Sequence, residues 1–171
     1  MAITHISLVN QKLAYAKATL GLLTSLSELS RLQQQALIDA CVFHLVSGYR
    51  FYLRELGENY RVKNLPLINN TQQLINALTA IDKIPSEATE LATLETSTES
   101  WLAQLLEYFD VLQQSPAIVK EAKAFESEVL IQAVDVTDTQ ASSPPNTSDL
   151  ALALDNFRQL IQRQRETSAE Y

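Results

Sequence analysis

Residues 6–23 read ISLVNQKLAYAKATLGLL, and their spacing decides the fold class. The apolar side chains recur in alternating steps of three and four residues: Ile6, Val9, Leu13, Ala16, Leu20 and Leu23. This spacing places them in one stripe along an α-helix, where neighbouring helices can cover them. The stretch therefore predicts a helix from Thr4 to Thr24 that packs against other helices.

The longest predicted helix follows almost at once, from Ser30 to Leu56, and ends near Gly57 or one turn beyond it. Its start has the form of a capping box, in which the Ser30 hydroxyl accepts a hydrogen bond from the third amide and Gln33 reaches back. Apolar and aromatic side chains cover about half of its circumference. Such a helix is typically central and touches two or more neighbours.

Proline residues punctuate the remaining chain where the apolar period breaks, which is typical of loops between helices. A helix capped by Asn70 or Thr71 is expected to bury Leu74, Ile75, Leu78 and Ile81. A short helical stretch opens at Ser86 and runs to Leu94. A second capping box at Thr96–Glu99 should start a helix whose buried stripe is Leu102, Leu105, Phe109 and Leu112, with Trp101 and Tyr108 beside it.

The chain beyond Pro116 divides into three predicted parts. Residues 117–134 form the first part, in which residues 117–126 predict a helix of moderate amphipathicity and residues 129–134 either lie extended across a helical surface or continue a helix. Residues 135–148 are polar and rich in Ser, Thr and Pro, so they predict a flexible linker. A final helix capped by Ser148 and Asp149 should return to the bundle, because it carries an apolar stripe: Leu150, Leu154, Phe157, Leu160 and Ile161.

These elements predict an all-α, up-and-down bundle of four to six helices with a long central second helix. Residues 1–134 would form the bundle core, and residues 149–171 would dock on it across the linker, so that the chain is one domain. A length of 171 residues fits one domain with its own core.

Composition excludes several classes of protein. The net charge of −7 argues against general nucleic-acid binding, which needs an excess of Lys and Arg. A single cysteine, Cys41, excludes an internal disulfide and favours a reducing compartment. We find no secretory signal at the N-terminus and no apolar stretch long enough to span a membrane, so we expect a cytoplasmic protein.

The sequence contains few residues or motifs that are typical of catalytic or ligand-binding sites, and we predict no catalytic, metal-binding or cofactor-binding residue. Phosphate-binding loops, the nucleophile elbow and Glu-x-x-His pairs are all absent. Cys41 and His44 share one helical face, but one further His cannot complete a zinc site. We expect a buried Cys41 and a core His44 that bonds a neighbouring polar group. Glu55 falls inside an apolar arc, and we expect it to reach water; the alternative is a buried partner such as Lys12 or Lys17.

The nearest approach to a binding site is a basic patch formed by Arg50, Arg54, Tyr60, Arg61 and Lys63. Arg and Tyr are enriched in interface hot spots, and Phe43 and Val46 lie on the same outward side as the two helical arginines. The alternative is that the final helix or residues 130–134 cover Phe43 and Val46, so that these two side chains are part of the core. Residues 82–110 hold seven acids and one Lys, which gives a second candidate docking region.

Four stretches together resemble a family of small proteobacterial proteins of unknown function: Asn10–Leu13, Ala40–Leu45, Glu99–Leu106 and Leu130–Val134. The resemblance implies a bacterial, cytoplasmic, all-helical protein and carries over no catalytic residue. We therefore predict a non-enzymatic interaction or scaffold module that binds a protein or another copy of itself. The alternative is a small-molecule-binding or enzymatic bundle with a pocket near His44, Tyr49, Tyr52 and Trp101.

Overall fold

The computed structural model describes residues 4–26, 28–114 and 145–169, and every regular element among them is a helix. In chain order these are α1 His5–Ser25, α2 Arg31–Asn59, the 3-10 turn η1 Leu65–Leu67, α3 Thr71–Thr79, α4 Ser86–Thr96, α5 Trp101–Gln113 and α6 Thr147–Ala169. The predictions of an all-α bundle and of a long second helix are confirmed, since α2 alone has 29 residues.

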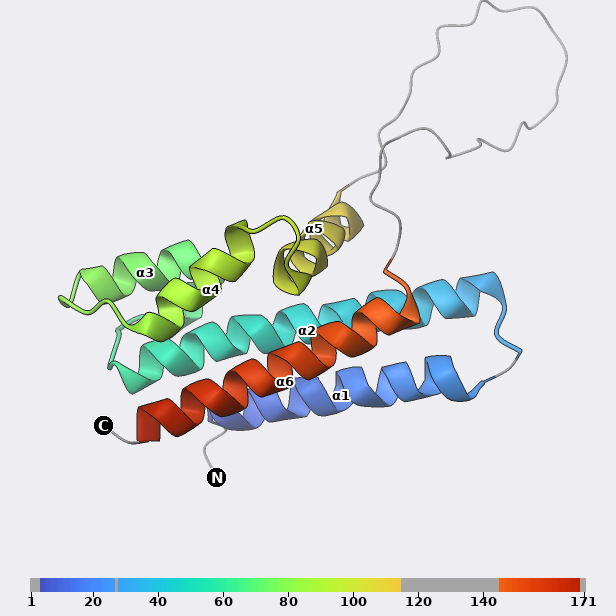
Figure 1. Ribbon diagram of the computed structural model, residues 1–171, viewed down its shortest axis with the longest axis horizontal. Helices are drawn as coiled ribbons and strands as arrows, with labels where there is room; N and C mark the ends of the chain where they lie inside the picture. Colours follow the sequence, from blue (N-terminus) through green and yellow to red (C-terminus); the bar gives the residue numbers. More distant parts are fainter. Residues whose placement is uncertain (1–3, 27, 115–144, 170–171) are drawn as a thin grey trace, which may run out of the picture.

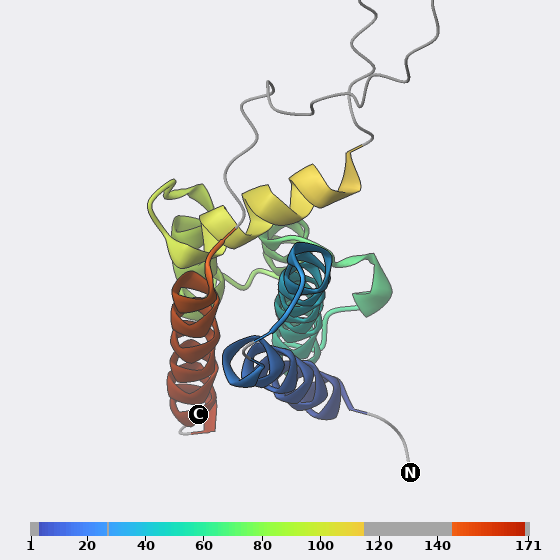
Figure 2. The same cartoon turned by 90° about the vertical axis from the view of Figure 1, so that its right-hand side faces the viewer.

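Three long helices form the frame of the molecule. α1 and α2 make an antiparallel hairpin, and α6 runs alongside them, so that the N- and C-terminal ends of the chain lie at the same end (Figure 1). α3 and α4 cover one end of α2, and α5 crosses the other helices (Figure 2). Because α2 contacts α1, η1, α3, α5 and α6, its predicted central place is confirmed.

The predictions for residues 117–134 and for most of the linker lie outside the described residues. Within the described part, the predicted linker is too long at its C-terminal end, because Thr147 and Ser148 already belong to α6. The physical reason is a cap one turn earlier than expected. Asn146 Oδ1 accepts from the Asp149 amide at 2.9 Å, and Asp149 Oδ2 accepts from the Asn146 amide at 3.2 Å.

Local polar signals place the other helix starts. The capping box at the start of α2 is confirmed, with the Gln33 amide 3.3 Å from Ser30 Oγ and the Ser30 amide 2.9 Å from Gln33 Oε1. The predicted box at Thr96–Glu99 is wrong. Thr96 instead ends α4 and donates to the Ala92 carbonyl at 2.8 Å, while Ser100 caps α5 by accepting from Ala103.

The core is centred on an aromatic side chain from α6. Phe157 lies fully buried, with ring centroids 6.4 Å from Tyr49, 6.1 Å from Tyr52 and 5.7 Å from Trp101. The predicted stripe of α6 is buried throughout. The prediction that Ile81 is buried is wrong, because α3 ends at Thr79. The prediction that Leu112 is buried is also wrong, because Leu112 lies in the last turn of α5 and is exposed.

Candidate functional site

The predicted basic patch begins on the outer face of α2. Arg50 and Arg54 stand one turn apart, and each guanidinium lies over an aromatic ring. The guanidinium carbon of Arg50 is 5.0 Å from the centroid of Phe109, and that of Arg54 is 5.5 Å from the centroid of Phe51. Partial burial and the positive charge of Arg50 lower the pKa of Arg54. The two charges are therefore neighbours, held in place by cation–π contacts.

Arg54 also ties α2 to the segment before α3. Its Nε donates to the Ile68 carbonyl at 3.0 Å, and its Nη2 donates to Asn69 Oδ1 at 2.7 Å. Neither Arg50 nor Arg54 pairs with a carboxylate in the part of the chain that the structure describes. Among the described residues, both arginines therefore keep a positive charge without a carboxylate partner, beside aromatic rings.

The other three residues of the patch lie just after these arginines. The Tyr60 hydroxyl points towards α4, where it donates to Glu87 Oε1 at 3.5 Å. Burial is the main cause that raises the pKa of Tyr60, and the negative charge of Glu87 adds to it. Arg61 adopts a left-handed backbone conformation with φ 57° and closes the end of α2. Arg61 and Lys63 are exposed. Arg50 and Arg54 thus share one face of α2, Arg61 and Lys63 follow its C-terminal end as exposed residues, and Tyr60 turns towards Glu87.

The apolar residues beside the patch divide between core and surface. Val46 is fully buried, so it belongs to the core, whereas Phe43 keeps 49% of its surface exposed. Lys12 of α1 places its Nζ 5.7 Å from the centroid of Phe43 and 5.8 Å from that of Tyr15. Lys12, Tyr15 and Phe43 therefore extend the cationic and aromatic face of α2 onto α1.

Cys41 and His44 show no arrangement for catalysis. Cys41 is buried and its thiol donates to the Ala16 carbonyl at 3.7 Å. Burial raises the pKa of Cys41 to about 11, so the reactive thiolate is disfavoured. The expectation that His44 bonds a polar neighbour is wrong for its Nδ1, which is buried without a partner among the described residues. The centroid of the His44 ring instead lies 5.3 Å from that of Tyr15. Burial is the main cause that lowers the pKa of His44, and the positive charge of Lys12 adds to it.

Three of the four residues of the predicted pocket surround an aromatic side chain. Tyr49, Tyr52 and Trp101 pack against Phe157, and His44 packs beside Tyr15. Both tyrosine hydroxyls are bonded inside the core, Tyr49 to the Thr71 hydroxyl and Tyr52 to Gln164 Oε1 at 2.7 Å. The sequence contained Phe157 as a stripe residue, but nothing indicated that its ring would fill this space.

Glu55 does not reach water, contrary to our expectation. It is 2% exposed, and both of its oxygens accept from Arg165 of α6, Oε1 from Nε at 2.7 Å and Oε2 from Nη2 at 2.8 Å. A buried partner was the alternative, but the expected lysines of α1 do not provide it. The two-point contact fixes how α6 lies on α2.

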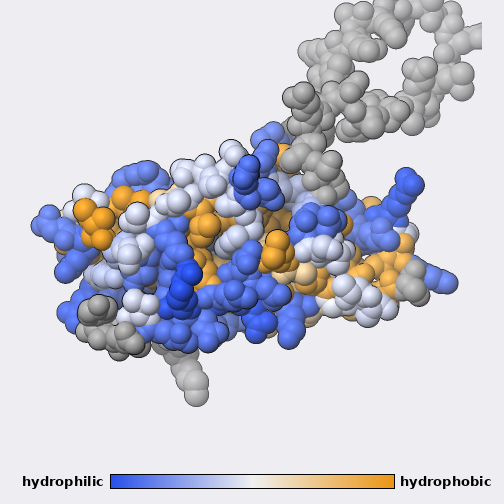
Figure 3. Space-filling model, in the orientation of Figure 1, coloured by the Kyte–Doolittle hydropathy of each residue, from blue (hydrophilic) through white to orange (hydrophobic). Residues whose placement is uncertain are grey.

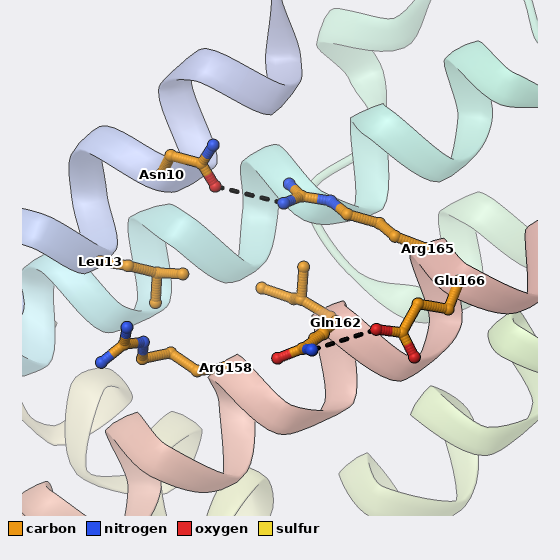
Figure 4. A pocket seen from close by; sticks show the side chains of 7 residues that line it. Asn10, Leu13, Arg158, Gln162, Arg165 and Glu166 are labelled. Atoms are coloured by element: carbon orange, nitrogen blue, oxygen red, sulfur yellow. Dashed lines mark hydrogen bonds between the residues drawn. The ribbon is translucent and has the colours of Figure 1, made fainter. Parts of the chain in front are cut away.

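Arg165 also forms part of the wall of an open groove of about 420 Å³ between α1 and α6 (Figure 4). Its Nη1 donates to Asn10 Oδ1 at 3.2 Å, and Gln162 donates to Glu166 at 3.0 Å. Arg158 extends towards Leu13 across the same groove (Figure 4). Most polar groups of this groove are thus already satisfied by one another.

Comparison with known proteins assigns the chain to a family. A family model described as a family of unknown function, DUF6586, matches residues 1–171. The chain belongs to this family. Neither the curated proteins nor the solved structures yield a match.

In this DUF6586 protein two pairs of arginines differ in their partners. Arg163 and Arg165 of α6 pair with Glu90 and Glu55, respectively. Arg50 and Arg54 of α2 instead lie over aromatic rings, and Arg54 also bonds backbone carbonyls, without a carboxylate partner among the described residues. The outer face of α2 is therefore positively charged in a chain whose net charge is −7.

The described residues also bear on two further classes, membrane-spanning proteins and metal-binding proteins. Among residues 4–26, 28–114 and 145–169, no helix combines the length and apolar character that a membrane span requires. Within the same ranges, no three His, Cys, Asp or Glu side chains gather as they would around a metal ion.

Proposed function

We propose that this protein is a non-enzymatic binding module that docks an acidic protein partner on the outer face of α2. This basic face comprises Lys12, Tyr15, Phe43, Arg50, Arg54, Arg61 and Lys63. The observation that carries the proposal is the pair Arg50 and Arg54, whose guanidinium groups lie over aromatic rings without a carboxylate partner in residues 4–26, 28–114 and 145–169. We further propose a bacterial, cytoplasmic setting, which the sequence resemblance and the lone cysteine support.

The geometry suits recognition of carboxylates. A guanidinium held over a ring loses little side-chain freedom when it binds, so less of the binding free energy is spent on ordering it. Arginine and aromatic side chains also dominate binding hot spots. Exposed Phe43 would supply the apolar contact beside the charges. An acidic partner that also offers an apolar side chain fits this surface best.

A second exposed apolar area supports an interaction role. Three exposed leucines lie where α1 meets α2: Leu22 in the last turn of α1, Leu26 in the connection, and Leu32, which is 81% exposed, in the first turn of α2. Figure 3 shows a hydrophobic area at that end of the molecule, separate from the mainly hydrophilic surface around it. A partner could bury these leucines together with the α1 side of the basic face.

Charge reversal tests the proposal. The chain is crosslinked in its native cell, and the captured proteins are compared for the wild type and two variants. Arg50→Glu with Lys63→Glu reverses the basic face and leaves the bonds of Arg54 to the Ile68 and Asn69 segment intact. Lys83→Glu is the matched control, since Lys83 is an exposed lysine between α3 and α4.

We expect one acidic protein to be lost from the Arg50→Glu, Lys63→Glu variant and retained by wild type and Lys83→Glu. Its binding to the purified chain should weaken as salt rises, because exposed charges are screened. If the reversed variant folds and keeps all captured proteins, the basic face is not the docking surface.

A further inference from the structure

A second feature of the molecule, independent of the basic face, is a cavity of about 240 Å³ between α5 and the first turns of α6. Its floor is apolar and almost fully buried, formed by Leu105, Leu150 and Ala153. Two aromatic residues, Trp101 and Tyr108, line it as well. The volume equals that of roughly eight water molecules at ~30 Å³ each, enough for a compact organic molecule.

Both aromatic rings are held in place by other contacts. Trp101 packs 5.7 Å from Phe157, centroid to centroid. The Tyr108 hydroxyl donates to Asp39 Oδ1 at 3.0 Å and accepts from Gln35 Nε2 at 2.7 Å. A ligand would therefore meet a preformed wall and would not have to order these side chains on binding.

The rim of the cavity is acidic. Glu107 and Asp149 line it, and no Lys or Arg is among its lining residues. Asp149 caps the first turn of α6 and offsets the partial positive charge of that helix end. Glu107 is exposed and makes no hydrogen bond or ion pair with the described residues. Within the part of the chain that the structure describes, the Glu107 charge thus has no partner, and it lines the same cavity as two aromatic rings.

From this geometry we infer that the α5–α6 cavity binds a compact organic cation, such as a quaternary or primary ammonium with an apolar body. The apolar groups would lie on the Leu105 and Leu150 floor, against the rings of Trp101 and Tyr108. The positive charge would face Glu107. Aromatic rings and a carboxylate are the groups that recognise such cations, through cation–π and ionic attraction. The acidic rim disfavours anionic ligands.

The cavity contains its own reporter, because Trp101 is the only tryptophan of the chain. The experiment titrates the full chain with choline and with 3,3-dimethylbutan-1-ol, a neutral molecule of nearly the same shape, and follows tryptophan fluorescence. We expect a saturable change with choline, with a dissociation constant in the millimolar range or tighter. The neutral alcohol should bind about twofold to fivefold more weakly if charge contributes as an exposed ion pair does.

Two variants separate the cavity from general attraction to an acidic protein. Glu107→Gln should weaken choline binding several-fold, whereas Asp110→Asn, which removes another exposed carboxylate of α5 outside the cavity, should leave it unchanged. The inference is overturned by any of three results: no saturable change with choline, equal binding of the neutral alcohol, or equal weakening in both variants. Because neither variant touches the basic face of α2, these results do not bear on partner docking.

Discussion

Replacing Arg165 with Met should destabilise the fold strongly, because it leaves the buried carboxylate of Glu55 without its counter-ion. Arg165 donates to both oxygens of that carboxylate at 2.7 and 2.8 Å. Removing one partner of a buried pair costs about 3–5 kcal/mol. The side chain of Arg165 is itself 29% exposed, so water can partly replace it. We therefore expect a loss of about 2–4 kcal/mol.

Urea unfolding followed by circular dichroism measures this loss. A small protein of this kind is stable by about 5–15 kcal/mol, so the midpoint should fall by roughly 1–3 M at ordinary m-values. The matched control is Arg163→Met, two residues earlier on the same helix. Arg163 pairs with Glu90 at the surface, where side chains are 63% and 39% exposed, and such a pair contributes about 0–1 kcal/mol.

A double variant separates the missing counter-ion from lost packing. Glu55→Met with Arg165→Met removes both charges, and it should recover most of the stability lost by Arg165→Met alone, since an apolar pair can replace a buried ion pair. The reasoning is refuted if Arg165→Met costs no more than Arg163→Met, or if the double variant is less stable than Arg165→Met.

Three further predictions concern single residues. Ser30→Ala should cost about 1 kcal/mol in urea unfolding, because it breaks the capping box with Gln33. Arg61→Gly should raise the free energy of unfolding by roughly 0.5–1 kcal/mol, because glycine adopts the left-handed φ of 57° without strain. A less stable variant would contradict this. Native Cys41 should react with a thiol reagent at pH 8 far more slowly than the urea-unfolded chain, since burial raises its pKa to about 11. The stability from its protonated thiol is complete below about pH 8.5 and is lost as the pH rises through about 11.

The sequence predicted those parts of the fold that depend on short-range patterns. The spacing of Ile6 to Leu23 and the Ser30–Gln33 box place α1 and α2 correctly because both signals lie within a few residues. The predicted start of α5 was wrong, although the same kind of signal was present at Thr96. Thr96 and Ser100 are both hydroxyl residues that can cap a helix. Because α4 continues to Thr96, the cap of α5 is Ser100.

The site was harder to predict because its partners are distant along the chain. Glu55 and Arg165 are 110 residues apart, and the sequence favoured a Glu55 that reaches water, with the lysines of α1 as the alternative partners. Phe157 likewise fills the space among Tyr49, Tyr52 and Trp101, where the sequence suggested a pocket. The cavity that the structure does show shares only Trp101 with that prediction. Its other wall comes from the first turns of α6, whose place against α5 no local pattern could indicate.

The distribution of charge explains how an acidic chain can present a basic face. α1 contains no Asp or Glu, and the three carboxylates of α2 are already engaged: Asp39 by Gln35 and Tyr108, Glu55 by Arg165, and Glu58 by His5 Nδ1 at 2.8 Å. Seven further acids lie in residues 82–110, where Glu107 lines the α5–α6 cavity. The carboxylates of α2 thus bond groups other than Arg50 and Arg54, which leaves these two arginines without a carboxylate partner among the described residues. An acidic partner would meet α2 and an organic cation would meet α5, and neither would compete for the groups that hold the bundle together.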